Sequence, residues 1–357
     1  MTDHPSSRPG RGVVICGAYG LGNAGDDAVL SAIVSDLRRL DEDMPVTVLT
    51  RTPGADAARL GVRAVHPLWL PGWLRAIRRA RLFISGGGSL LQDVTSRRSL
   101  SFYLFTLRAA RRMGCAVQLY GCGVGPLDRP GSREKTARVL NACADAATLR
   151  DGESLALLQS MGVTVPRLLL AADPALSLPA PAGERERAAG FALRNWPGVY
   201  DILPDLADLA AYIYEAYRLP PVFFCLAPED RKPARAMCAM LEDRGVPCSL
   251  SVDARRVGKM GLLISMRLHG LIFALRAGTP AAGLSYDPKV AAFCREADLP
   301  CLSLAESSEK TLRDLADDAM HLDGETLSAA LDALRARERI NSRTAAQLLA
   351  ERDTETD

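Results

Sequence analysis

Four residues that could act on an anionic substrate follow apolar segments of this sequence. Arg150 ends the stretch AATLR, Arg267 and His269 lie where the apolar run LLIS gives way to a helical pattern, and Lys289 follows Asp287 and Pro288. An arginine binds a phosphate or carboxylate through two N–H groups, whereas a lysine acts as a point charge. A histidine titrates near neutrality and can exchange a proton with a substrate. Three cations beside one proton donor suit a small substrate that carries several negative charges.

Each of these residues also has a purely structural interpretation. Arg150 could form an ion pair with Asp151 or Asp173, and Lys289 could be a solvated residue of a first helical turn. A lone histidine is often structural, but His269 is the one of the four histidines that falls at a strand-to-helix junction beside an arginine. The sequence leaves both interpretations open.

Two glycine-rich segments each join an apolar strand to a helical pattern. The segments GAYGLGNAGDDAVL and SGGGSLLQD supply the candidate substrate-binding residues Gly20, Gly22, Asn23, Gly25, Asp26, Gly86, Gly87, Gly88, Ser89 and Gln92. Glycines let a ligand approach the backbone, and the start of a helix presents free N–H groups to an anion. We therefore expect an anion- or sugar-binding edge here, with turns needed only for packing as the alternative.

The spacing of Gly20, Gly22 and Gly25 also fits the GxGxxG pattern of dinucleotide-binding proteins. That pattern needs an acidic residue after the second strand, where it binds a ribose hydroxyl. The second strand, VTVLT, is followed by Arg51 instead. The sequence therefore disfavours an NAD-dependent dehydrogenase.

Apolar strands alternate with helical patterns from residue 13 onward, and a segment rich in Pro, Ala and charge interrupts them at 178–190. This rhythm predicts an α/β protein with two Rossmann-like domains, whose parallel sheets face a cleft. The expected parts are a disordered tail at 1–12, domains at 13–180 and 191–324, a linker at 181–190, and a C-terminal helix and tail at 325–357.

Composition narrows the class of protein further. The net charge of +2 over 357 residues gives no argument for nucleic acid as a partner. The nine cysteines form no CxxC pair, and no His/Asp/Cys cluster has the spacing of metal ligands, so we expect reduced thiols and no metal. No signal peptide and no run of 18 apolar residues is present, which predicts a cytoplasmic protein.

A segment with two tryptophans and several arginines, HPLWLPGWLRAIRRARL (66–82), could bring the protein to a membrane. Such a mixture suits the anionic inner face of a membrane as a peripheral contact. The alternative is an ordinary helix with a solvated basic face.

Seven motifs taken in order resemble one known family. YGLGNAGDDAVL, SGGGSLLQD, GCGVGP, RDGES, DPAL, SMRLHG and SYDPK are similar to segments of the polysaccharide pyruvyl transferases, most closely of the CsaB type. The resemblance covers about residues 13–300. It implies a fold like that of the GT-B glycosyltransferases, phosphoenolpyruvate as co-substrate without a further cofactor, and a sugar that receives pyruvate as a ketal.

The resemblance also implies partners and roles. For the CsaB type, the acceptor is a lipid-linked precursor of a secondary cell-wall polymer that contains N-acetylmannosamine, and the finished polymer anchors surface-layer proteins. The first domain would bind the acceptor and the second the donor. Arg150, Arg267 and His269 match the expected catalytic positions, and Lys289 matches a substrate-binding position. The segment 221–234 departs from the more polar pattern that the family would have after that strand.

Two other classes of function remain as rivals. A GT-B glycosyltransferase that uses a nucleotide sugar would have a similar fold, but it needs a carboxylate for the ribose, and none stands at an obvious place after SMRLHG. A non-catalytic carbohydrate-binding protein would not need the arginine, histidine and lysine set.

Overall fold

A computed structural model describes residues 12–94 and 96–354. Contacts divide the chain into two compact units. The first contains the described residues up to Leu21, Asp26–Pro174 and those from Arg337 onward, and the second contains Gly22–Gly25 and Ala175–Ala336. The predicted tail at 1–12 lies outside the described residues except for Gly12, which begins the first strand.

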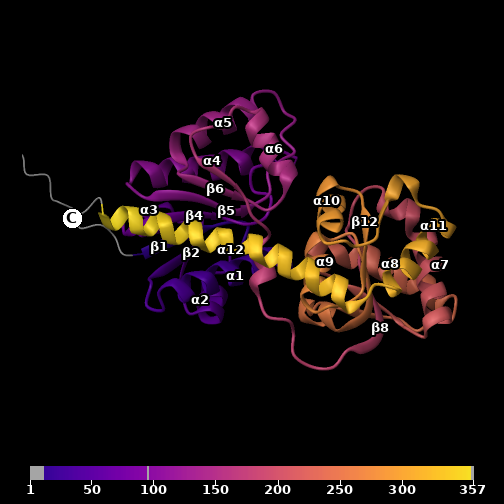
Figure 1. Ribbon diagram of the computed structural model, residues 1–357. Coiled ribbons are helices and arrows are strands. Elements are labelled where there is room, and N and C mark those ends of the chain that lie inside the picture. The colour runs from indigo at the N-terminus through magenta and orange to yellow at the C-terminus, as the bar shows by residue number, and fades with distance from the viewer. Residues whose placement is uncertain (1–11, 95, 355–357) are drawn as a thin grey trace, which may run out of the picture. The chain divides into compact units, whose positions relative to one another are not determined.

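Among the described residues, the first unit has seven parallel strands in the order β3-β2-β1-β4-β5-β6-β7 (Figure 1). The strands are β1 (Gly12–Cys16), β2 (Val46–Leu49), β3 (Arg63–Val65), β4 (Ala80–Gly86), β5 (Ala116–Cys122), β6 (Ala146–Leu149) and β7 (Arg167–Leu170). The central strands β1, β5 and β6 are buried along their whole length, as expected for a parallel sheet covered on both faces.

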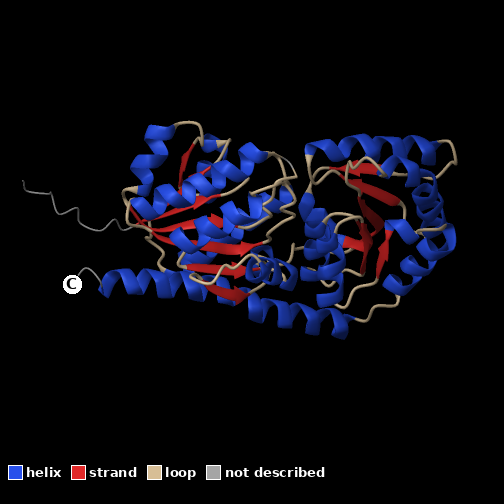
Figure 2. Ribbon diagram, turned by 90° about the horizontal axis from the view of Figure 1, so that it is seen from above, coloured by secondary structure: helices blue, strands red, loops and turns tan. Residues whose placement is uncertain are grey.

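Helices connect these strands and flank the sheet (Figure 2). They are α1 (Ala24–Leu40), α2 (Pro53–Leu60), α3 (Leu70–Ile77), α4 (Arg97–Arg112), α5 (Ser132–Cys143) and α6 (Gly152–Ser160). Helix α1 has Asp26 and Asp27 in its first turn and Arg38 and Arg39 in its last, which matches the sign of charge that each end of the helix dipole favours.

The described part of the second unit contains a six-stranded parallel sheet in the order β10-β9-β8-β11-β12-β13. The strands are β8 (Glu186–Ala192), β9 (Pro221–Phe224), β10 (Ser249–Ser251), β11 (Met260–Ser265), β12 (Ala281–Ser285) and β13 (Cys301–Ser303). Strand β8 begins inside the segment that we expected to be a linker. Its first two residues, Glu186 and Arg187, are charged, which hides the start of the strand from an apolar pattern.

The helices of the second unit also alternate with its strands. The α-helices are α7 (Val199–Tyr217), α8 (Arg231–Glu242), α9 (Leu268–Arg276), α10 (Pro288–Glu296), α11 (Glu309–Met320) and α12 (Gly324–Thr354). Short 3-10 helices are η1 (Pro174–Ser177), η2 (Pro228–Asp230), η3 (Ala254–Lys259) and η4 (Leu304–Glu306). Together the two sheets confirm the predicted α/β class with two parallel-sheet domains.

The long C-terminal helix α12 belongs partly to each unit. In the second unit, Arg335 donates to the carbonyl of Leu176 (3.0 Å). In the first, Arg337 donates to the carbonyl of Ala171 (2.7 Å), and Asn341 accepts through its backbone from Gln118 (3.0 Å). The helix is therefore built into both units.

Each unit has its own hydrophobic core on its sheet. Phe83, Leu104 and Leu119 are fully buried in the first, and Phe191, Phe223 and Ile264 in the second. Burying one such side chain stabilises a fold by roughly 1.5–3 kcal/mol. These cores hold the strand ends, from which the functional side chains project. No described helix is long and apolar enough to span a membrane.

Candidate functional site

The strand order of each sheet reverses direction at one pair of neighbouring strands. This pair is β1 and β4 in the first unit, and β8 and β11 in the second. Ligands of such sheets bind beyond the carboxyl ends of the strands at this switch point. The predicted residues cluster at these ends, in Gly20–Asp26 after β1, Gly86–Gln92 after β4, and Arg267–His269 after β11.

In the first unit, the two glycine-rich loops pack on each other. The hydroxyl of Tyr19, which is buried after β1, donates to the carbonyl of Gly86 at the end of β4 (2.7 Å). Gly87 has a φ of 60°, and a Cβ there would lie 1.9 Å from Cγ1 of Val29 in α1. A larger residue would therefore push the loop away from the helix. Gly86, Gly87 and Gly88 are buried, so these glycines are needed for packing, as our alternative interpretation stated.

Arg150, at the end of β6, is buried and has three side-chain partners. Its Nη2 donates to Oγ of Ser89 (3.0 Å), its Nη1 lies 3.4 Å from Oδ2 of Asp173, and its Nε lies 3.4 Å from Oδ2 of Asp151. The structure thus brings Arg150 and Ser89 together, although they are far apart in the sequence. It also shows the ion pairs that the structural interpretation of Arg150 expected.

The other predicted residues of this unit lie near the same edge. Asp26 comes close to Gly88, where a Cβ would lie 3.1 Å from its Oδ1. Gln92 is half-buried, and the neighbouring Asp93 accepts from the backbone N–H groups of Asp128 (3.1 Å) and Arg129 (2.9 Å). Although burial opposes its ionisation, a hydrogen bond from Ser132 and these N–H groups lower the pKa of Asp93. Asp93 therefore holds the loop after β5 in place.

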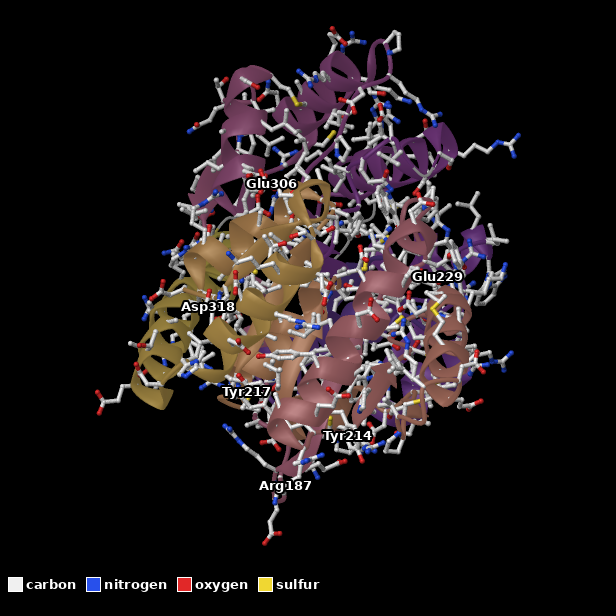
Figure 3. All side chains as sticks on the ribbon, turned by 90° about the vertical axis from the view of Figure 1, so that its right-hand side faces the viewer. Arg187, Tyr214, Tyr217, Glu229, Glu306 and Asp318 are labelled. Carbon is white, nitrogen blue, oxygen red and sulfur yellow. The ribbon has the colours of Figure 1, made fainter. Side chains whose placement is uncertain are left out.

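In the second unit, Arg267 stands between β11 and α9 and is held by two acidic residues of η2. Its Nε donates to Oδ2 of Asp230 (3.1 Å), and its Nη2 donates to Oε1 of Glu229 (2.9 Å). Asp230 is fully buried, whereas the side chain of Glu229, labelled in Figure 3, is 49% exposed. Burial raises the pKa of Asp230 in spite of the arginine. Arg267 thus joins a buried carboxyl group to a solvent-facing one.

His269 lies in the first turn of α9, two residues after Arg267, and is half-buried. Its ring stands 6.2 Å from that of Phe273, with the planes tilted by 41°. Contacts assign Gly22–Gly25, which includes Asn23, to this unit, and Ala24 N–H donates to the carbonyl of Leu226 (2.8 Å). A Cβ on Gly25 would lie 2.1 Å from Nδ1 of His269, so only glycine fits against this ring.

Lys289 lies in the first turn of α10, beyond the end of β12. Its Nζ is 2.8 Å from Oδ2 of Asp287. The other carboxylate oxygen of Asp287, Oδ1, accepts from the backbone N–H of Lys289 (3.1 Å). Burial opposes ionisation of Asp287, but the lysine prevails and lowers its pKa. Lys289 therefore forms an ion pair and also lies at the edge of the sheet where ligands bind.

Sequence reasoning missed a second arginine at the switch point of this unit. Arg194, two residues after β8, donates to the hydroxyl of Tyr286, and its guanidinium carbon lies 5.3 Å from the centre of that ring. Trp196 packs on the same ring, with centroids 5.7 Å apart. The rule that selected Arg150, a cation directly after an apolar strand, would also have selected Arg194.

The acidic partners of Arg267 were missed for another reason. Glu229 and Asp230 lie in the segment 221–234, whose sequence departs from the expected family pattern. A pair of acidic residues before a helix is common, and no local signal connects them to an arginine 37 residues later. Within the described ranges, no group of three or more His, Cys, Asp and Glu side chains is arranged to hold a metal ion.

Three solved structures illustrate the likeness of this fold to known ones. UDP-GlcNAc 2-epimerase from Methanocaldococcus jannaschii has a TM-score of 0.62 and 11% identity, covering 91% of this chain and 99% of its own. A putative UDP-N-acetylglucosamine 2-epimerase from Listeria monocytogenes has a TM-score of 0.66 and 12% identity, covering 97% of each chain. Anabaena HepE, solved with UDP, has a TM-score of 0.63 and 9% identity, covering 96% and 100%. At these identities the likeness establishes the GT-B-like fold alone.

Sequence comparison is more specific about the family. No curated protein gives a significant match to this sequence. The polysaccharide pyruvyl transferase family matches residues 23–288, which is most of the chain and includes Arg150, Arg267 and His269. The chain belongs to the polysaccharide pyruvyl transferase family, and the predicted resemblance is confirmed at that level.

Proposed function

We propose that this protein transfers a pyruvyl group from phosphoenolpyruvate to a sugar, which receives it as a ketal. The observation that carries the proposal is the family match, which extends over the strand ends of both units. Because enzymes of this class must hold a donor with a phosphate and a carboxylate, the cations at those strand ends support it.

The second unit is the proposed donor side. Arg194, Arg267 and Lys289 all follow strands of one sheet, and His269 stands beside Arg267. An arginine has five N–H donors, so Arg267 can keep its contacts with Asp230 and still offer donors to a ligand. Ion pairs that fix a guanidinium in advance lower the cost of aligning it with a phosphate. The half-exposed Glu229 would give way to the incoming anion.

The chemistry requires one proton transfer to carbon. The methylene carbon of phosphoenolpyruvate takes a proton and becomes a methyl group, while positive charge develops on the central carbon. One sugar hydroxyl forms a C–O bond there, the bond to phosphate breaks, and a second hydroxyl closes the ketal. Of the two hydroxyl protons lost, one balances the new methyl group and one leaves with phosphate. We assign the proton exchange to His269, because imidazole can both give and take a proton near pH 7.

The first unit is the proposed acceptor side. Its switch point offers the hydroxyl of Ser89 and the amide of Gln92, both half-buried, beside the buried glycines Gly86–Gly88. Such groups hydrogen-bond sugar hydroxyls without adding charge. Following the CsaB type, the proposed acceptor is a lipid-linked cell-wall precursor that contains N-acetylmannosamine, modified in the cytoplasm.

The test is to incubate the purified protein with phosphoenolpyruvate and lipid-linked sugars that differ in one residue. We expect phosphate release that depends on the acceptor, together with a mass gain that matches one ketal-linked pyruvate. Phosphate release without an acceptor product, or no consumption of phosphoenolpyruvate with any acceptor, would contradict the proposal.

A glycosyltransferase that uses a nucleotide sugar is the second candidate, because a similar fold occurs in HepE solved with UDP. The same incubation with UDP-N-acetylglucosamine in place of phosphoenolpyruvate separates the two. Release of UDP with transfer of a sugar would favour this second candidate.

A further inference from the structure

The first unit has a pocket at the edge of its sheet opposite the glycine loops. The first residues of β1, β3 and β4 line it, and α3 covers it. Because all strands run parallel, these amino ends lie together at one edge. The pocket has a volume of about 200 Å³ and is lined in part by Val13, Val65 and Trp69.

Arginines surround this pocket. Arg63, Arg75 and Arg79 line it, and Arg63 and Arg79 have exposed side chains, as does the neighbouring Arg78. Within residues 12–94 and 96–354, none of these four arginines forms an ion pair. The chain has no Asp or Glu between Asp56 and Asp93. This segment therefore contributes only positive charge to the edge, in contrast to the paired cations at the strand ends.

Three large apolar side chains stand next to the arginines. The exposed fractions are 79% for Leu68, 59% for Trp69 and 44% for Leu70. Single exposed apolar residues need no explanation, but a run of three beside a basic cluster is typical of an interaction surface.

These apolar residues are held in a fixed position. Trp73 in α3 is buried and packs edge-on against Phe105, which anchors the helix to the domain. The indole of Trp69 lies over Gly72, where a Cβ would come within 2.1 Å of its Cε3. The indole of Trp69 is thus already ordered, and little side-chain entropy is lost when it contacts a partner surface.

We propose that this edge, formed by Arg63, Leu68–Leu70, Arg75, Arg78 and Arg79, docks the protein on an anionic phospholipid membrane. Leu68, Trp69 and Leu70 enter the interface between headgroups and acyl chains, where tryptophan is favoured. The arginines bind lipid phosphates, and the pocket takes one headgroup. Each arginine near an anionic surface contributes about 1 kcal/mol, equivalent to about fivefold in partitioning.

The occupant is a membrane rather than a nucleic acid because three apolar side chains project between the cations. Nucleic-acid sites use arginines to contact phosphates and aromatic side chains to stack on bases, and two exposed leucines would have no role there. The proposal does not depend on the donor chemistry, because the pocket and the glycine loops lie at opposite edges of one sheet.

The test is co-sedimentation of the full chain with vesicles. One set contains phosphatidylcholine alone, and the other contains equal parts of phosphatidylcholine and phosphatidylglycerol. We expect binding to the mixed vesicles that weakens with added salt, and little binding to the neutral ones. Arg75→Gln and Arg79→Gln are each expected to lower the partition coefficient about fivefold. Trp69→Ser should lower it at least tenfold. All three residues lie at the surface or at the pocket rim, so folding should persist, as circular dichroism can verify.

Matched controls come from the second unit. Arg187, labelled in Figure 3, has an exposed side chain, and Leu250 is 43% exposed. Arg187→Gln and Leu250→Ser should bind like the unchanged protein. An equal loss of vesicle binding in the control variants would show that nonspecific electrostatic or hydrophobic adsorption drives binding, and would overturn the proposal. Equal binding to both vesicle types would also overturn the proposal. The same holds if the protein binds RNA or soluble glycerol phosphate but does not bind vesicles.

Discussion

The switch points of the two sheets use opposite means to prepare a surface. In the first unit, buried glycines pack the loops closely, and Arg150 at the end of β6 is buried between Asp151 and Asp173. In the second, Arg194, Arg267, His269 and Lys289 follow the adjacent strands β8, β11 and β12, and all four are half-buried. The first offers hydrogen bonds without free charge, while the second offers charge and a titratable ring.

This difference fits a reaction between a neutral polyol and a small polyanion. Arg150 carries one positive charge beside two carboxylates, so its surroundings do not favour a further anion. The cluster around Arg267 has a carboxylate, Glu229, that reaches solvent and can rearrange. We therefore expect the charged residues of the second unit to govern catalysis, and Arg150 to govern the stability of the first.

The largest effect is expected for His269→Ala. Loss of a proton-exchanging group should lower kcat by roughly 10²–10⁴-fold with little change in the KM for phosphoenolpyruvate. His321→Ala is the matched control, because His321 is exposed at the end of α11, away from any strand end. Steady-state kinetics at several pH values checks this. Unchanged kcat in a folded variant would remove His269 from the reaction.

Arg267→Lys should come next. The lysine keeps the charge that Asp230 needs, so the fold persists, but it loses the planar fork. We expect kcat/KM for phosphoenolpyruvate to fall by roughly 10²–10³-fold. Arg255→Lys provides the control, since Arg255 forms an exposed pair with Asp253 in the same unit (3.0 Å). An equal loss of kcat/KM in the two variants would contradict the special role of the strand-end arginine.

Arg150→Met should act on stability instead. Removing the guanidinium deprives the buried carboxylate of Asp173 of its contact with Arg150, and breaking a buried pair costs roughly 3–5 kcal/mol. Urea unfolding measures this loss, and a second change, Asp173→Asn, should restore part of it. If Arg150→Met left stability unchanged but abolished binding of phosphoenolpyruvate, the two switch points would not differ as described.

A smaller effect involves a buried carboxyl group away from both switch points. Glu338 of α12 is buried beside Asp36, and burial together with the charge of Asp36 raises the pKa of Glu338 to about 8. Tyr120 donates to Asp36 (2.5 Å). The folded state binds the proton of Glu338 more tightly than the unfolded state does. The contribution of Glu338 to the free energy of unfolding is therefore greatest below pH 4.5 and declines as the pH rises toward 8.

Glu338→Gln should abolish this dependence, because the amide stays neutral. In urea unfolding, the free energy of unfolding should differ less between pH 6 and pH 9 in the variant than in the unchanged protein. A variant with the same pH dependence would show that another group causes it. Turnover at pH 7 should change little, which separates stability from the chemistry at the strand ends.

The sequence was sufficient for the fold class and for most strands, because buried parallel strands leave continuous apolar runs such as VVIC and LLIS. It was not sufficient for the start of β8, where the residues are charged, or for the role of α12, which depends on hydrogen bonds to Ala171 and Gln118. Strand-end position located Arg150 and Arg267. The sequence also named Asp151 and Asp173 as partners of Arg150. It missed Glu229 and Asp230, the partners of Arg267, because they belong to a common helix start that is distant in sequence.

The most direct test is nuclear magnetic resonance of the reaction in D₂O with phosphoenolpyruvate and a lipid-linked acceptor. The account predicts that inorganic phosphate appears in step with a ketal whose new methyl group carries one deuterium from solvent. A signal of phosphoenolpyruvate that persists unchanged while a nucleotide sugar supplied in parallel is consumed would contradict it.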